Sequence, residues 1–195
     1  MQHELLKGSA TQAPDTNWNI WNGEKMKTRP CHIAQVNIGQ ARAAIDDPVM
    51  SGFVARLEEI NALAEASTGF VWRLKTEQGD ATSLQPYEDE RILINLSVWQ
   101  SPEHLRHYVY KTAHAEVMRQ RRQWFERFND VYMALWWIAP GHIPTIAEAK
   151  ERLAYLQLHG ETEFAFSFAS LLGKSVTGAA PPSNATSPLA TPVHP

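Results

Sequence analysis

Apolar side chains between residues 31 and 170 recur at two spacings, one typical of strands and one typical of helices. Short segments rich in β-branched and aromatic residues predict five strands, at 32–38, 70–76, 91–99, 131–138 and 163–168. Apolar positions three and four apart predict three helices, at 48–68, 101–125 and 145–160. Asp47 and Ser101 each precede a proline, and Thr145 opens a capping box with Glu148, so each predicted helix has a start signal.

The order of these elements is β-α-β-β-α-β followed by α-β, and this order predicts a fold class. A split β-α-β repeat gives an α+β, ferredoxin-like domain with an antiparallel sheet and helices on one face. The other face, if apolar, needs a cover, and a second copy of the chain is the usual one. We therefore expect a symmetric homodimer whose two sheets pack together.

The two ends of the chain differ from its middle. Residues 1–29 are polar and show no periodicity, which predicts a loosely ordered leader; the role of Trp18 and Trp21 within it stays open. Residues 171–195 are rich in Ala, Pro, Ser and Thr, a composition that favours disorder. The folded domain is therefore expected at residues 30–170.

Composition narrows the function classes. The net charge is −3 and the pI about 6.2, which argues against a nucleic-acid partner. Four arginines at 119, 121, 122 and 127 cluster locally, and we interpret them as the solvated side of a helix. Cys31 is the single cysteine, as suits a reducing compartment. The longest apolar stretch, 131–139, is too short to span a bilayer, so we expect no membrane partner and a cytoplasmic location.

The predicted helix 101–125 carries His104, His107 and His114 on nearly one face. His114 lies among small residues, and two roles remain open for it. It would act as an iron ligand or general base, or it would simply bond a backbone carbonyl. His107 is the second candidate, while His104 is expected in solvent. No firm metal site is predicted, because His107 and His114 lie about 10 Å apart along a continuous helix.

Polar residues alternate on two predicted strands. Gln35 and Asn37 share one face of the first, and Asn95 and Ser97 share one face of the third. Buried amides are costly unless paired, so these groups either bond each other or bind a ligand. Arg73 either anchors a carboxylate or pairs with the loop at 77–80. Six aromatic residues form core, dimer contacts or the wall of a pocket for a flat organic ligand: Phe70, Trp72, Trp99, Tyr108, Trp136 and Trp137.

Several segments together resemble one uncharacterised bacterial family, a domain of unknown function in the dimeric α/β-barrel superfamily. They are His32-Ile-Ala-Gln-Val-Asn-Ile, Gly69-Phe-Val-Trp-Arg-Leu-Lys-Thr, Ser97-Val-Trp-Gln-Ser, Tyr110-x-x-x-His114-Ala-Glu-Val-Met-Arg, Trp124-Phe and Ala134-Leu-Trp-Trp. More distantly, the chain is similar to antibiotic-biosynthesis and haem-degrading monooxygenases, which share a Gly-Phe turn, a Trp-x-Ser exit and a later helical histidine. In the haem degraders this histidine binds iron.

The resemblance implies a site. It places His114 at the histidine position and Asn37 at an asparagine of the first strand, whereas Tyr108 stands where the haem degraders have tryptophan. It implies a monooxygenase, free of cofactor or dependent on haem, acting on an aromatic or polycyclic compound. The expected catalytic residues are His114, Asn37, Tyr108 and His107, and the expected ligand-binding residues are Trp99, Trp72, Gln35, Asn95 and Arg73. The alternative is a dimeric protein that binds hydrophobic ligands without chemistry.

Overall fold

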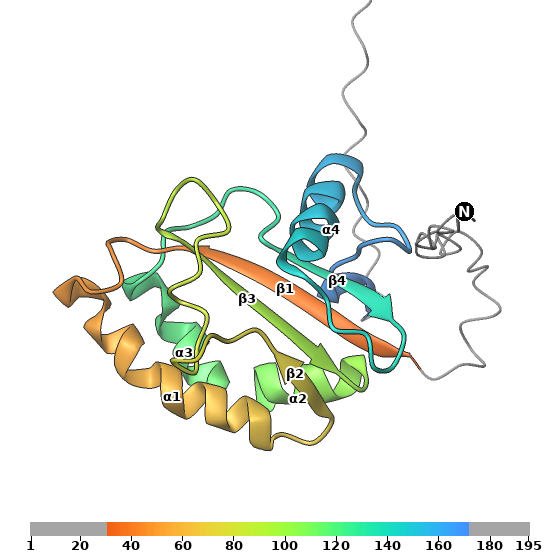
Figure 1. The fold of residues 1–195 in the computed structure, drawn as a ribbon, viewed down its shortest axis with the longest axis horizontal. Coiled ribbons are helices and arrows are strands. Elements are labelled where there is room, and N and C mark those ends of the chain that lie inside the picture. The colour runs from red at the N-terminus through yellow and green to blue at the C-terminus, as the bar shows by residue number, and fades with distance from the viewer. Residues whose placement is uncertain (1–30, 172–195) are drawn as a thin grey trace, which may run out of the picture.

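The computed structural model describes residues 31–171 (Figure 1). The predictions for the leader, including Trp18 and Trp21, and for nearly all of the tail lie outside the described residues. The strands are β1 (His32–Gln40), β2 (Phe70–Arg73), β3 (Ile92–Trp99) and β4 (Met133–Ile138). The α-helices are α1 (Ser51–Ala66), α2 (Pro102–Lys111), α3 (His114–Gln120), α4 (Ile146–His159) and α5 (Phe168–Leu171), with short 3-10 turns η2 (Pro48–Met50) and η3 (Arg121–Gln123).

The four strands form one antiparallel sheet in the order β2-β3-β1-β4. This order, with α1 between β1 and β2 and with α2 and α3 between β3 and β4, confirms the predicted ferredoxin-like α+β fold. β1 lies in the middle of the sheet, and its pairing sets the register of the site. Asn37 lies opposite Asn95 of β3 and opposite Met133 of β4.

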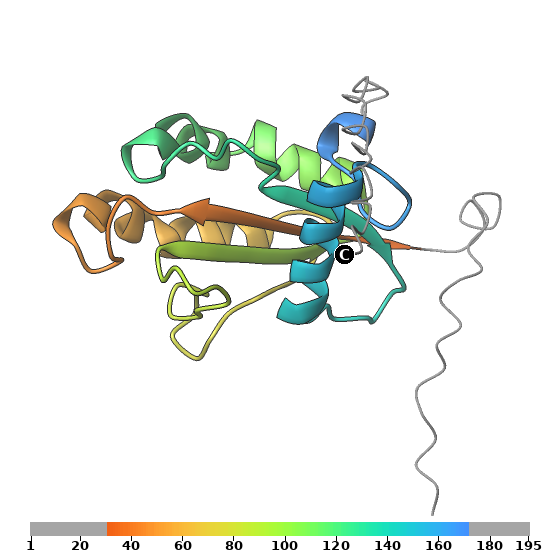
Figure 2. The same ribbon diagram turned by 90° about the horizontal axis from the view of Figure 1, so that it is seen from above.

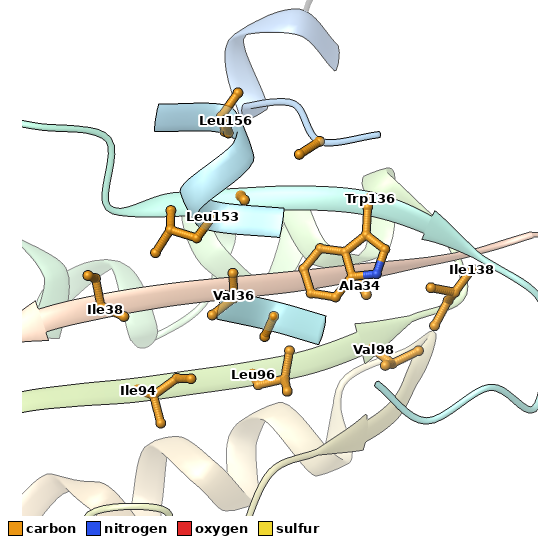
Figure 3. Packing of buried hydrophobic residues seen from close by; sticks show 13 residues of the cluster. Ala34, Val36, Ile38, Ile94, Leu96, Val98, Trp136, Ile138, Leu153 and Leu156 are labelled. Carbon is orange, nitrogen blue, oxygen red and sulfur yellow. The ribbon is translucent and has the colours of Figure 1, made fainter. Parts of the chain in front are cut away.

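Both faces of the sheet carry helices (Figures 1 and 2). Helices α1, α2 and α3 lie on one face, where Ile33 and Trp99 pack with Leu105 of α2. Helix α4 lies on the opposite face, with Leu153 and Leu156 packed over the sheet (Figure 3). The expectation of helices on one face therefore holds for α1–α3 but not for α4.

The centre of the sheet face under α4 is apolar and buried within the single chain. Its strand residues are Ala34, Val36, Ile38, Ile94, Leu96, Val98, Ala134, Trp136 and Ile138, each no more than 5% exposed. We expected a second copy of the chain because this face would need a cover. Since α4 supplies that cover, the reason given for the homodimer does not apply here, and the dimer itself stays a prediction.

The predicted helix 101–125 is interrupted. It ends at Lys111, and Thr112 takes an extended conformation with φ −118° and ψ −179°. The Thr112 hydroxyl donates to the Tyr108 carbonyl at 2.6 Å and accepts the His114 N–H at 3.2 Å. A threonine side chain that bonds nearby backbone in this way competes with the helix. His114 therefore begins α3, and the predicted single stripe of three histidines is wrong.

The predicted fifth strand, 163–168, is reduced to one bridge. Phe166 and Leu135 exchange two backbone hydrogen bonds of 2.8 and 2.9 Å. The Ser167 hydroxyl then accepts the N–H of Ala169 at the start of α5. The local turn chemistry thus ends the extended segment after one paired residue. Among residues 31–171, no helix combines the length and apolar character needed to cross a membrane.

Candidate functional site

A chain of side-chain hydrogen bonds crosses the face of β1 and β3 that carries α1–α3. We call it the polar ladder, and its members are Trp99, Ser97, Gln35, Asn37 and Asn95. Trp99 Nε1 donates to Ser97 Oγ (3.1 Å), Ser97 Oγ to Gln35 Oε1 (3.1 Å), Gln35 Nε2 to Asn37 Oδ1 (2.7 Å), and Asn95 Nδ2 to Asn37 Oδ1 (2.9 Å). The ladder follows from alternation and register, because directly opposite side chains share a face.

The hydrogen bonds of the polar ladder converge on the side chain of Asn37. Its Oδ1 accepts two hydrogen bonds, whereas its Nδ2 has no hydrogen-bond partner within residues 31–171. Chained hydrogen bonds polarise one another, so this last amide is a strengthened donor. Of the two roles left open by the sequence, the groups do bond each other, and they still leave one donor for a ligand.

The ladder runs from a buried end to an open end. Trp99, Gln35 and Ser97 are buried, Asn37 is half-buried, and Asn95 is exposed. Asn95 belongs to an inner strand and faces the helix layer, so its exposure means that the helices do not close over it. Helix α1 is loosely packed accordingly: Ala64 is its single buried residue. Solvent therefore reaches the Asn95 end of the ladder.

A stack of aromatic rings continues from the buried end. The rings of Trp99 and Phe70 pack edge-on, with their centroids 5.4 Å apart. The rings of Trp99 and Tyr108 are stacked, with their centroids 5.1 Å apart and an angle of 25° between their planes. The Tyr108 hydroxyl donates to the Ile60 carbonyl of α1 at 3.3 Å, and burial raises the pKa of Tyr108. Tyr108 therefore ties α2 to α1, and its hydroxyl is turned to backbone. The expectation that it is a catalytic donor has no support in this geometry.

His114 lies at the far side of this stack, 4.7 Å from the Tyr108 ring. Its Nδ1 is 3.4 Å from the Val109 carbonyl, the backbone contact expected of a structural histidine. Burial lowers the pKa of His114, so the imidazole is neutral at pH 7. A neutral imidazole is also the form that accepts a proton, and Nε2 has no partner within residues 31–171. The general-base role and the structural role of His114 are therefore both compatible with its surroundings.

Two other predicted site residues lie elsewhere. His107 is exposed on α2, away from the buried stack of Tyr108 and Trp99. Trp72 lies opposite Val98 and packs into the apolar cluster under α4, so the expectation that it lines the ligand site is corrected. The reason is alternation, since Trp72 and its neighbour Arg73 point to opposite faces.

Arg73 is buried and makes structural contacts. Its guanidinium donates to Glu65 of α1 at 3.0 Å and to the Gly79 carbonyl at 2.7 Å. Pairing with the 77–80 loop was one of the two expected roles, and the partner there is the backbone. The sequence offered no sign of the Glu65 pairing. The predicted site residues also omitted Ser97, although its alternation with Asn95 and Trp99 was the available signal.

On the side of His114 that faces the sheet, the described residues leave no room for haem. One face of the His114 imidazole is covered by Tyr108, and Tyr108 in turn is stacked on the fully buried Trp99. These rings fill the space between β3 and His114, so a porphyrin bound at Nε2 of His114 would have to lie outside this stack. No cluster of three His, Cys, Asp or Glu side chains suited to a metal ion occurs within residues 31–171.

Comparison with solved structures gives several distant likenesses. SnoaB from Streptomyces nogalater, a cofactor-independent oxygenase, is 15% identical with a TM-score of 0.38, over 58% of this chain and 98% of SnoaB. Rv0793 from Mycobacterium tuberculosis is 15% identical with a TM-score of 0.40, over 58% and 99%. A candidate antibiotic biosynthesis monooxygenase from Chloroflexus aurantiacus J-10-fl is 15% identical with a TM-score of 0.38, over 59% and 98%. Likenesses at this level carry no argument about activity.

Sequence comparison is more specific. No curated protein matches the chain. The family model described as Domain of unknown function (DUF3291) matches residues 32–179, about three-quarters of the chain, and the chain therefore belongs to that family.

Proposed function

We propose that this protein binds a small aromatic molecule with an acidic hydroxyl group at the exposed end of the polar ladder, on the sheet face that carries α1–α3, and oxidises it as a haem-free, monooxygenase-type enzyme. The observation that carries the proposal is the unpartnered Nδ2 of Asn37 at the accessible end of the polar ladder. The ladder holds this donor in place before any ligand arrives.

The ligand would bind with its oxygen toward Asn37. A preorganised donor is most effective where negative charge develops, so the ladder favours an enolate or phenolate over the neutral form. Met133 lies directly opposite Asn37 on β4 and is half-buried, so it offers an apolar neighbour for the ring. Apolar walls with a few fixed polar groups are typical of small-molecule sites.

The reaction needs a base and molecular oxygen. Neutral His114 is the candidate base, because its burial keeps the imidazole unprotonated at pH 7. A molecule bound at Asn37 would have to extend to Nε2 of His114, at the far side of the aromatic stack. The proposed substrates are fused-ring ketones in which one ring contains both a C=O and a CH₂ group. This ketone form interconverts with an enol form, which carries the acidic hydroxyl group. The CH₂ carbon loses two C–H bonds and gains a C=O; one oxygen atom enters the product and the other leaves as water with both hydrogens. The substrate supplies all four electrons, so no separate reductant is required.

The test measures oxygen uptake with 1,8-dihydroxyanthrone, with the rate in buffer subtracted. Asn37→Asp is the informative variant, because it keeps an oxygen for Gln35 and Asn95 but removes the Nδ2 donor. We expect the wild-type protein to stimulate oxygen uptake and Asn37→Asp to lose most of that stimulation, by roughly 10²–10³-fold as for an oxyanion donor. His114→Gln should lose activity, whereas His107→Gln, at an exposed position, should not.

A non-catalytic binding protein is the second candidate, and the Nδ1 contact of His114 with the Val109 carbonyl favours it. In that role, His114 would only stabilise the junction between α2 and α3. A protein that binds the anthrone without raising oxygen uptake, and whose affinity is the same in His114→Gln, would contradict the oxygenase proposal and establish this one. Loss of binding in Asn37→Asp would support the ladder as the site in either case.

A further inference from the structure

A hollow lies away from the polar ladder, at the end of α3. It has a volume of about 460 Å³, and its lining residues are Met118, Arg119, Arg121, Arg122, Phe125, Glu126, Arg127, Phe128 and Tyr132. We call it the arginine hollow. The sequence suggested that these four arginines form a solvated helix side; in the structure, they surround a space together with three aromatic rings. None of the lining residues belongs to the polar ladder.

The charge of the arginine hollow is unbalanced. Four guanidinium groups face one carboxylate, in a chain whose net charge is −3. That carboxylate, Glu126, already lies 3.8 Å from the guanidinium of Arg42. Placing several positive charges close together is unfavourable because they repel one another, and a bound anion would reduce this repulsion. The hollow therefore suits an anionic ligand.

Two of the arginines are available for such a ligand. Arg122 and Arg127 are exposed, and within residues 31–171 neither has a hydrogen-bond or ion-pair partner. The other two are already engaged: Arg119 bonds Glu116, and Arg121 donates to the Tyr132 hydroxyl at 3.2 Å. A guanidinium fork matches the oxygens of a phosphate or a carboxylate and binds either one at two points.

The aromatic residues add a second element of recognition. The rings of Phe128 and Tyr132 lie 6.3 Å apart at 32°, and Arg121 lies over the Tyr132 ring, 4.8 Å from its centroid. Such surfaces hold a flat ring by stacking. A volume of about 460 Å³ is within the usual range for one small molecule.

We propose that the arginine hollow is a binding site for a small anionic aromatic molecule, a flat ring that carries a phosphate or a carboxylate group. The phosphate or carboxylate contacts Arg122 and Arg127, and the ring lies against Phe128 and Tyr132. This site is independent of the proposed oxidation at the polar ladder, and neither proposal depends on the other.

The test compares three probes that share one ring: 2-naphthyl phosphate, 2-naphthoate and uncharged 2-naphthol, each titrated into the full chain by calorimetry. We expect at least one of the two anions to bind at least ten-fold more tightly than 2-naphthol. The anion that binds more tightly identifies whether the hollow prefers a phosphate or a carboxylate group. Arg122→Gln and Arg127→Gln should each weaken anion binding roughly ten-fold, the loss expected for one hydrogen bond between charged groups. Arg106→Gln, which removes the same charge at an exposed position of α2, should leave affinity unchanged.

Three outcomes would overturn the proposal. The first is equal affinity for 2-naphthol and both anions, or no anion binding at millimolar concentration. The second is an equal loss of affinity in Arg106→Gln, which would mean that only overall charge matters. The third is tighter, arginine-dependent binding of a single-stranded oligothymidylate, which would make the surface a nucleic-acid site. Circular dichroism of each variant checks that the fold is kept, and the two single variants test the same contact separately.

Discussion

The rings of Tyr108 and His114 lie 4.7 Å apart although they belong to two different helices. The break at Thr112 makes this contact, because it turns α3 so that its first residue meets the last buried residue of α2. Tyr108 is thereby held between His114 on one side and Trp99 on the other. By packing against both residues, the Tyr108 ring connects the helix layer to the sheet.

Replacing Tyr108 should therefore be costly because of its ring more than its hydroxyl. Tyr108→Ala is expected to lower the free energy of unfolding by about 3–5 kcal/mol, as for other large buried aromatics. Tyr108→Phe removes one bond to the Ile60 carbonyl and should lose only about 0.5–1.5 kcal/mol. Urea denaturation followed by tryptophan fluorescence measures both. Equal losses in the two variants would show that the stack is not what stabilises the fold here.

His114 should make stability depend on pH. Its pKa is lowered by burial in the folded protein, whereas the unfolded chain takes up the proton near pH 6.5. The unfolded state then binds more protons, so the free energy of unfolding falls as pH drops through that value and levels off below the folded pKa. Denaturation at several pH values between 5 and 8 should show a smaller fall in His114→Gln than in the wild type. His107→Gln is the matched control and should keep the wild-type profile.

Gly69 should not tolerate a side chain. It has φ +79°, a conformation that costs other residues about 1–2 kcal/mol. A Cβ there would also lie 2.2 Å from Cγ of His104, so Gly69→Ala should lower the thermal midpoint strongly. Adding His104→Ala removes the contacts with the imidazole ring but leaves the Cβ of residue 104 at 2.6 Å and the backbone cost, so the double variant should recover only part of the loss. Strict additivity of the two single effects would argue that the contact with His104 is unimportant.

Two leucines of α4 test how the apolar sheet face is covered. Leu153 is 2% exposed and packs on the sheet, so Leu153→Ala should cost about 2–5 kcal/mol of stability. Leu158 is 77% exposed on the same helix, and Leu158→Ala should change stability by about 0.5 kcal/mol or less. Thermal unfolding compares the stability of the two variants. Separately, light scattering of the wild-type chain measures its oligomeric state and so tests the predicted homodimer. Similar small losses in both variants would mean that α4 does not seal this face.

Much of the fold follows from local rules that operate within a few residues. Alternation alone places Gln35 beside Asn37, and Asn95 beside Ser97, because neighbouring strand residues point to opposite sides. The caps at Asp47, Ser101 and Thr145 are visible in the same way, and each one accepts the backbone bond expected of it. The order of these elements was enough to predict the antiparallel ferredoxin-like sheet.

The site depends on relationships between distant parts of the chain. Periodicity shows that Asn37 and Asn95 each face one side, but only strand register makes them opposite partners. The apolar stripe of α4 predicts a helix with a buried side and does not say which sheet face receives it. The break at Thr112 is a competition between one hydroxyl and the helix, and its outcome depends on the packing of Tyr108. The arginine hollow forms for a similar reason, because the segment after α3 returns to β4 and brings Phe128 and Tyr132 beside the arginines.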